Sequence, residues 1–315
     1  AGLELEVVDR LLHFAERLAE RLALFEGERA RQLLVALPRV DAAAAGEHFV
    51  ADRSRDRIRI SPGGRMFFGE RDADPLCRLP AVPEYERTQG YFELVETHVN
   101  PNAHLELVTL QAMGADTINV SNRKAFVERD AKMSWYIGMF GSLLSRYKTD
   151  SIMKGPGASA EDVEIIFGIA NQSFDVASNL IHHGQHSRGR VLVKSVLKDT
   201  SKSLFKGMIK IDKQGRGTES YLAGHAILLD RGAKSDAIPG LEIETNEVKA
   251  THSASVAQMD ENQIYYLMTR GLSREGAKRE IVSGFLEPLS RKMGPTIRAW
   301  INYLIENKWQ GKQLM

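Results

Sequence analysis

The chain has a single cysteine, Cys77, among its 315 residues. One thiol cannot form an internal disulfide or supply a cysteine-rich zinc or iron–sulfur site within one chain. No run approaches the roughly 20 apolar residues that a membrane-spanning helix needs. The N-terminus also lacks the basic segment and apolar core of a secretory signal. The sequence therefore predicts a cytoplasmic protein that does not cross a membrane.

Neither sign of charge is in excess. Lys and Arg number 42, Asp and Glu 41, and the formal net charge is +1. This balance gives no electrostatic reason to expect nucleic acid or an anionic membrane as a partner. Hydrophobic residues make up 43% of the chain and prolines number 10. That composition predicts a globular protein with one large or two modest domains.

Motifs of common enzyme classes are missing as well. The chain has no G-x-x-x-x-G-K-[ST] phosphate loop and no G-x-S-x-G nucleophile turn. The glycine-rich segment 153–158 contains Pro156, which lacks a backbone donor, so we interpret it as a turn rather than a phosphate site. The sequence motifs therefore assign the chain to none of these enzyme classes.

The first 90 residues predict a helical and irregular region. Apolar residues recur at steps of three and four between residues 3 and 37, which predicts an amphipathic helix ended by Pro38. Residues 42–86 are rich in Gly and Pro, and we expect loops with short strands at Arg57–Ile60 and Arg65–Phe68.

Residues 91–257 predict a β-rich core. Short apolar or alternating runs are separated by Gly, Asn, Asp and Lys, with almost no helical stretch between them, which argues against a doubly wound α/β fold. A sandwich and a β-solenoid both remain open, because no clean repeat decides between them. The expected strands are Leu105–Leu110, Thr117–Val120, Met133–Phe140, Val163–Ile169, Val191–Leu197, Phe205–Ile211, Ala226–Leu229 and Leu241–Thr245.

A helical period returns after Asp260 and predicts a helical domain over residues 258–315. Ser273 is a suitable N-cap for its second helix. Pro288 and Pro295 punctuate a third helical region, and Pro295 suits the first turn of the last helix.

Histidines cluster in the segment LIHHGQHSRGRV. On a strand, His182 and His186 would share one face and His183 would take the other. A metal site also needs convergent ligands and a supporting carboxylate. We favour a solvated or hydrogen-bonded strand face and keep a metal site at His182 and His183 as the weaker alternative.

An ordered series of residues between Gly138 and Phe285 resembles the shared core of the SufB/SufD family, the scaffold proteins of Suf iron–sulfur cluster assembly. The series comprises Gly141-Ser142, Arg146, Gln172, Asp175, Thr200-Ser201-Lys202-Ser203, Pro239, Leu241-Glu242-Ile243, His252, Asp260, Gln263, Tyr266-Leu267, Arg270-Gly271, Ala277 and Gly284-Phe285.

The resemblance implies a mainly β fold: a right-handed parallel β-helix flanked by N- and C-terminal helical parts. It implies a non-catalytic scaffold that binds the SufC ATPase through the C-terminal helices and pairs through its β-helix with a SufB/SufD-type subunit or with itself. No cofactor is expected to be held stably, although a transient iron–sulfur cluster could form at a subunit interface. The implied partner-binding residues are Gln263, Tyr266, Leu267, Arg270, Gly271 and Phe285.

Two departures from the family pattern make the chain resemble the SufD type. SufB-type chains carry a cysteine shortly before Pro239, where this chain has Ala237, and SufD-type chains often carry Cys-x-His where it has Ala250-Thr251-His252. His252 is thus the expected ligand for a cluster or metal. Two alternatives remain: a homodimer acting without SufB, and a β-helix enzyme using Glu242 and Glu244 as paired carboxylates.

Overall fold

Two parallel β-sheets dominate the computed structural model, which describes residues 30–36, 48–50, 59–61 and 89–311. The seven-stranded sheet contains, in spatial order, β1 (Ala30–Ala36), β5 (His104–Gln111), β7 (Lys132–Met139), β9 (Ser159–Gly168), β11 (Arg188–Leu197), β13 (Glu219–Leu228) and β15 (Lys249–Gln258). The six-stranded sheet contains β14 (Lys234–Ile243), β12 (Lys202–Ile211), β10 (Ser173–His182), β8 (Leu144–Met153), β6 (Thr117–Val127) and β4 (Gln89–Val99).

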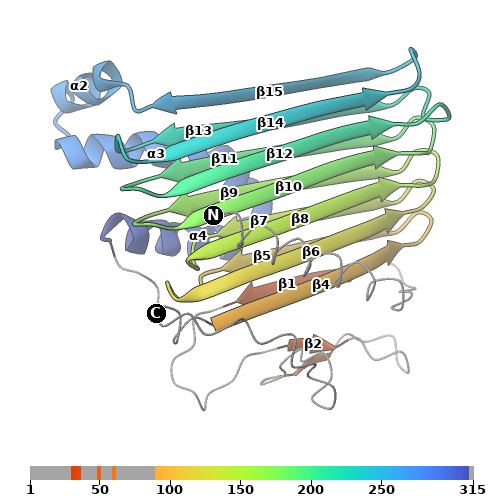
Figure 1. The fold of residues 1–315 in the computed structure, drawn as a ribbon, viewed down its shortest axis with the longest axis horizontal. Coiled ribbons are helices and arrows are strands. Elements are labelled where there is room, and N and C mark those ends of the chain that lie inside the picture. Colours follow the sequence, from red (N-terminus) through yellow and green to blue (C-terminus); the bar gives the residue numbers. More distant parts are fainter. Residues whose placement is uncertain (1–29, 37–47, 51–58, 62–88, 312–315) are drawn as a thin grey trace, which may run out of the picture.

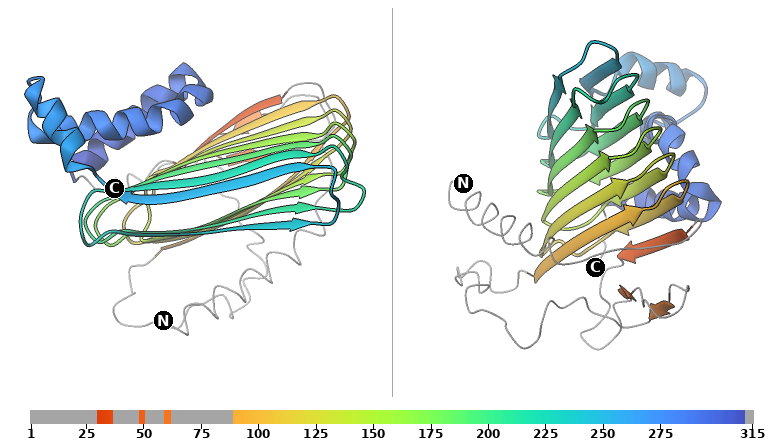
Figure 2. Two further views of the ribbon diagram at one scale, coloured as in Figure 1. Left: turned by 90° about the horizontal axis from the view of Figure 1, so that it is seen from above. Right: turned by 90° about the vertical axis from the view of Figure 1, so that its right-hand side faces the viewer.

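The chain alternates between the two sheets, so each successive pair of strands forms one coil of a solenoid. The strands from β4 to β15 make six coils, stacked in Figure 1 and seen end-on as two layers in the left view of Figure 2. Every strand pairing within these sheets is parallel. This arrangement confirms the expected β-solenoid and excludes the sandwich, because sandwiches pair their strands mainly antiparallel.

Left-handed residues stack at one corner of the solenoid. Positive φ angles occur at Asn102, Asp130, Gly157, His186 and Gly217, which are 27 to 31 residues apart. Each of these residues donates its backbone N–H to a carbonyl of the following coil. The corner is crowded: a Cβ on Gly155 would lie 2.1 Å from the backbone nitrogen of Arg129. Segment 153–158 is therefore the turn from β8 to β9, as predicted.

Apolar side chains form two cores. The first fills the lumen between the sheets and includes Trp135, Tyr147, Phe174 and Phe205. The second lies between the outer face of β9 and the C-terminal helices, where Val163, Ile165 and Phe167 contact the helical layer. Successive side chains of β9 therefore pack alternately into the first and the second core, which explains why nearly the whole strand is buried.

The C-terminal helices are α2 (Glu261–Thr269), α3 (Arg274–Ser290), the 3₁₀ helix η3 (Arg291–Met293) and α4 (Gly294–Trp309). They lie against the seven-stranded sheet near one end of its strands (Figure 2). Ser273 caps α3 by accepting a hydrogen bond from the N–H of Gly276, and Pro295 lies in the first turn of α4, as expected. Pro288 does not separate two helices but lies inside α3.

The helix predicted for residues 3–37 is wrong over Ala30–Ala36, which form β1. This segment pairs in register with β5, so a sheet partner overrides its local helical period. Part of the strand expected at Arg57–Ile60 is present as β3 (Arg59–Ser61), which pairs antiparallel with β2 (His48–Val50). Cys77, segment 65–68 and the rest of the N-terminal predictions lie outside the described residues. No helix in the described part of the chain is long and apolar enough to span a bilayer.

Candidate functional site

The last coil of the solenoid leaves both of its strands open on one side. β14 pairs only with β12 and β15 only with β13, and no described strand lies beyond them (Figure 1). The backbone N–H groups of Lys234 and Glu244 point toward β12, where they donate to the carbonyls of Ser201 and Ile211. Because backbone direction alternates along a strand, the odd-numbered residues of β14 direct their polar groups to the open edge.

This open edge is unusually apolar. The side chain of Ile238 is 60% exposed, and Leu241, Ile243 and Val256 are also exposed. Pro239 lies at an edge-facing position, where its missing N–H leaves a gap in the row of donors. Glu242 accepts a hydrogen bond from Nζ of Lys210 at 2.5 Å, and this contact raises the pKa of Lys210. Exposed strands of this kind are templates for pairing with another chain.

His252 lies on β15 in register with Leu222, which is part of the lumen core. Its side chain therefore points to the lumen side, and it is exposed because no described coil covers it. Ala237 and Ala250, at the two positions where family members carry cysteine, both pack partly against the lumen core. No three His, Cys, Asp or Glu residues in the described ranges gather as a metal site.

The other histidines are divided between the end of a strand and the turn that follows it. His182 ends β10 and is buried, with its ring nitrogens hydrogen-bonded to Ser187 at 2.8 Å and Ser220 at 3.0 Å. Burial, with a smaller effect of His183, lowers the pKa of His182 to about 3. His183 contacts Asp212, a partner that sequence reasoning missed. The prediction that His186 shares a strand face with His182 is wrong, because His186 lies in a left-handed turn.

A second candidate surface lies on α2 and the start of α3. Tyr265 is 70% exposed and Tyr266 57%, and Met268 and Leu272 are exposed beside them. An open groove of about 410 Å³ is lined by Asn262, Gln263, Tyr266, Leu267 and Ile281. Three of the six predicted partner-binding residues thus line one groove. Arg270 lies over the Tyr266 ring at 5.2 Å, and Gly271 ends α2 with a φ of 93°.

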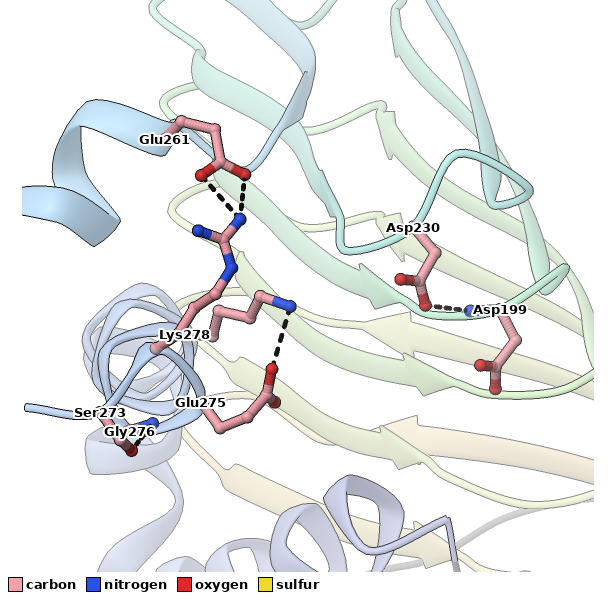
Figure 3. Close-up of polar contacts among 8 residues, drawn as sticks. Asp199, Asp230, Glu261, Ser273, Glu275, Gly276 and Lys278 are labelled. Carbon is pink, nitrogen blue, oxygen red and sulfur yellow. Dashed lines mark hydrogen bonds and ion pairs between the residues drawn. The ribbon is translucent and has the colours of Figure 1, made fainter. Parts of the chain in front are cut away.

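Polar contacts link the two helices of this α2–α3 arm. Glu261 accepts hydrogen bonds from Nη2 of Arg274 at 2.6 and 2.7 Å, which ties the start of α2 to the first turn of α3 (Figure 3). Lys278 pairs with Glu275 along α3 in the same view. The apolar core beneath α3 holds the arm against the solenoid.

Phe285, the sixth predicted partner-binding residue, faces the solenoid instead of the groove. Nζ of Lys194, on β11, donates to the Phe285 carbonyl at 2.5 Å and lies 4.6 Å from the centre of its ring. Burial lowers the pKa of Lys194. Burial and the nearby Lys194 charge lower the pKa of His225 on the adjacent strand. Lys194 is thus an anchor for α3, and sequence reasoning missed it because the two residues are 91 positions apart.

Comparison with known proteins gives a consistent picture. The family described as "SUF system FeS cluster assembly, SufBD core domain" matches residues 79–285. Proteins named iron–sulfur cluster assembly SufBD family protein from Staphylococcus epidermidis (strain ATCC 12228), Staphylococcus aureus (strain USA300) and Staphylococcus haemolyticus (strain JCSC1435) are each 28% identical to the chain over 230 residues. That alignment covers 73% of this chain and 50% of each relative. The chain therefore spans about half the length of these relatives.

Proposed function

The chain belongs to the SufBD family of iron–sulfur cluster assembly proteins, and from this premise we propose that it is a non-catalytic scaffold subunit. In this proposal the open edge of β14 and β15 pairs with a SufB/SufD-type subunit or a second copy. The α2–α3 arm binds the SufC-type ATPase. The observation that carries the proposal is the open last coil, because β14 and β15 leave unpaired edges and β14 also exposes apolar side chains, which makes the coil a template for strand pairing.

The sequence of β14 supports pairing with a second copy. In an antiparallel pair centred on Ile238, Lys234 of each copy lies opposite Glu242 of the other, and the two Ile238 side chains meet on the two-fold axis. The backbone N–H groups of Ser235, Ala237 and Leu241 face the partner strand, whereas Pro239 has no N–H to donate. The edge is therefore self-complementary in charge and in apolar contact.

The α2–α3 arm supports the ATPase contact by its composition. Two largely exposed tyrosines beside a groove resemble the aromatic anchors that dominate binding energy in protein interfaces. The arm is also joined to the solenoid through Lys194 and Phe285. A movement imposed on the arm by the ATPase would thus reach β11 and the strands next to the open edge.

His252 is the candidate ligand for iron–sulfur cargo at the paired edge. Its imidazole is exposed on the lumen side of the last coil, and neighbouring family positions hold alanine, so the chain supplies no thiolate there. A thiolate from the partner subunit would complete a mixed ligand set of the kind that iron–sulfur centres use. The cluster is cargo in this proposal and is not held by the chain alone.

Light scattering coupled to size-exclusion chromatography tests the pairing edge. We expect the mass of a dimer for the chain alone, or of a one-to-one complex once a SufB-type partner is added. Ile238→Lys should leave the chain monomeric in both cases, because it places a charge inside the apolar contact. Tyr303→Lys is the matched control: Tyr303 is 56% exposed but lies on α4, outside the two edge strands. Assembly that survives Ile238→Lys, or fails equally in Tyr303→Lys, contradicts the proposal.

A further inference from the structure

Two acidic residues lie deep in the solenoid lumen. Asp162 and Glu164 are next-but-one neighbours on β9 and so point to the same side. Asp162 is in register with Trp135 and Glu164 with Ile137, both members of the lumen core. Asp162 is 2% exposed and Glu164 is fully buried. Carboxylates are rarely buried to this extent unless they are paired or bind a metal.

The oxygen atoms around this acid pair are incompletely satisfied. Oγ of Ser178 donates to Oε1 of Glu164 at 2.7 Å. Oδ1 of Asp162, Oε2 of Glu164 and Oγ1 of Thr149 have no hydrogen-bond partner within the described part of the chain. Buried polar atoms without partners are uncommon in folded proteins and indicate a bound water or ion.

Thr149 faces the same part of the lumen. It lies on β8 in register with Ser178 on one side and Arg123 on the other, and residues in register on parallel strands share a face. Ser178 contacts Glu164, and Arg123 donates to Thr109 in the lumen. Thr149 is 1% exposed, and its hydroxyl oxygen is buried. It is therefore directed toward the acid pair.

The charges near the acid pair do not balance. Arg123 is the neighbouring cation, and it is already bound to Glu93, with Nη2 to Oε2 at 2.6 Å and Nε to Oε2 at 3.2 Å. Ionised Asp162 and Glu164 would therefore leave two uncompensated negative charges in a dry lumen. Such charges are too costly to bury unpaired, so two protons or one divalent cation must neutralise them.

We propose that Asp162, Glu164 and Thr149 form a binding site for a hard divalent cation such as Mn²⁺, Mg²⁺ or Fe²⁺ inside the solenoid. Carboxylate oxygens are the ligands that these ions prefer, and a threonine hydroxyl is a known supplement. One such ion removes the charge imbalance and satisfies all three unpartnered oxygens. The site is independent of the scaffold role and of His252. Because the lumen is closed, the cation enters as the solenoid folds.

The strands beside the acid pair offer no compensating charge. The register neighbours of Asp162 and Glu164 on β7 and β11 are Trp135, Ile137, Val191 and Val193, all of which are apolar or aromatic.

The test uses the full chain, unfolded in urea with a chelator and refolded with Mn²⁺ at pH 8. After desalting, bound Mn²⁺ is counted by atomic absorption and electron paramagnetic resonance. We expect one ion per chain. Asp162→Asn/Glu164→Gln should abolish retention. Glu161→Gln is the matched control, because Glu161 lies next to Asp162 on the outer face of β9 and pairs with Lys292.

A second variant keeps the proposal falsifiable if the double variant does not fold. Thr149→Val removes an unpartnered hydroxyl at nearly constant volume, so the metal-free protein should fold at least as well as the wild type. Its Mn²⁺ affinity should fall about tenfold or more. A folded wild-type chain that retains no Mn²⁺, or retention that is unchanged in both Asp162→Asn/Glu164→Gln and Thr149→Val, overturns the proposal.

Discussion

The ion pair between Arg123 and Glu93 offers a quantitative test of the lumen. The two side chains are only 2% and 5% exposed, and Nη2 of Arg123 lies 2.6 Å from Oε2 of Glu93. The guanidinium also donates to Oγ1 of Thr109 at 3.0 Å and lies 5.1 Å from the centre of the Tyr147 ring. Arg123→Met keeps most of the side-chain volume but removes the charge and all of these donors.

The expected cost of Arg123→Met follows from the carboxylate it leaves behind. Removing one partner of a buried pair costs about 3–5 kcal/mol, because the remaining charge is buried without compensation. Removing both partners is much less harmful, since well-packed apolar residues of similar volume are often neutral replacements. Glu93→Leu/Arg123→Met should therefore recover most of the stability that the single variant loses.

Urea unfolding at pH 7.5, followed by circular dichroism, measures this cost. Arg123→Met should lower the free energy of unfolding by about 3–5 kcal/mol. The free energy of unfolding of Glu93→Leu/Arg123→Met should lie within about 1–2 kcal/mol of the wild-type value. Lys210→Met is the control, because its pair with Glu242 is on the exposed face of the sheet. Its midpoint should stay close to that of the wild type. A negligible cost of Arg123→Met, or a double variant as unstable as the single one, would refute the reasoning.

Three further predictions concern Glu164, Lys308 and His252. In the presence of chelator, the pKa of Glu164 is about 7 in the folded chain and 4.5 in the unfolded chain, so the folded chain binds the proton more tightly. The free energy of unfolding should therefore fall by about 3 kcal/mol as pH rises through that range. Urea unfolding midpoints of Glu164→Gln should not show this fall with pH, and an unchanged fall would contradict the assignment to Glu164. Burial lowers the pKa of Lys308 from 10.5 to about 7, so the folded chain binds fewer protons than the unfolded chain and stability rises with pH above 7. Lys308→Met should remove that rise in thermal melts at pH 7 to 10, and persistence of the rise would assign it to another group. His252→Ala should reduce cluster formation in a reconstituted complex severalfold, read from the visible absorbance, while leaving the melting temperature unchanged; a wild-type cluster yield would exclude His252 as a ligand.

Residue patterns alone predicted a strand-rich core with C-terminal helices but could not separate a solenoid from a sandwich. The reason is visible at the corners of the coils. Asn102, Asp130, Gly157, His186 and Gly217 adopt the same left-handed conformation with four different residue types, so the structural repeat leaves no sequence repeat. The family resemblance supplied the fold that periodicity could not.

Strands of low hydrophobicity were also missed. β15 has the sequence KATHSASVAQ, which lacks an apolar run because its lumen face is covered by no further coil. β10 alternates polar and apolar residues, and only its histidine-containing end was interpreted as a strand. Capping signals were more reliable: Ser273 and Pro295 took the positions that local chemistry predicted, because a helix end depends on few neighbours.

The candidate sites were predictable only where they are local. Gln263, Tyr266 and Leu267 lie within one helix and line one groove. The lumen acids were missed because the strand was expected to begin at Val163, which left Asp162 outside it. Phe285 and Lys194 meet across 91 positions, a separation that no local pattern encodes.

Co-purification with a SufC-type ATPase, followed by its ATP turnover with and without the chain, tests the scaffold role most directly. We predict a stable complex with altered turnover, weakened at least tenfold by Tyr265→Ala/Tyr266→Ala on the α2–α3 arm. Trp300→Ala should bind like the wild type, because Trp300 is an exposed aromatic residue on α4, outside the arm. A well-folded chain that neither binds the ATPase nor changes its turnover would contradict the account.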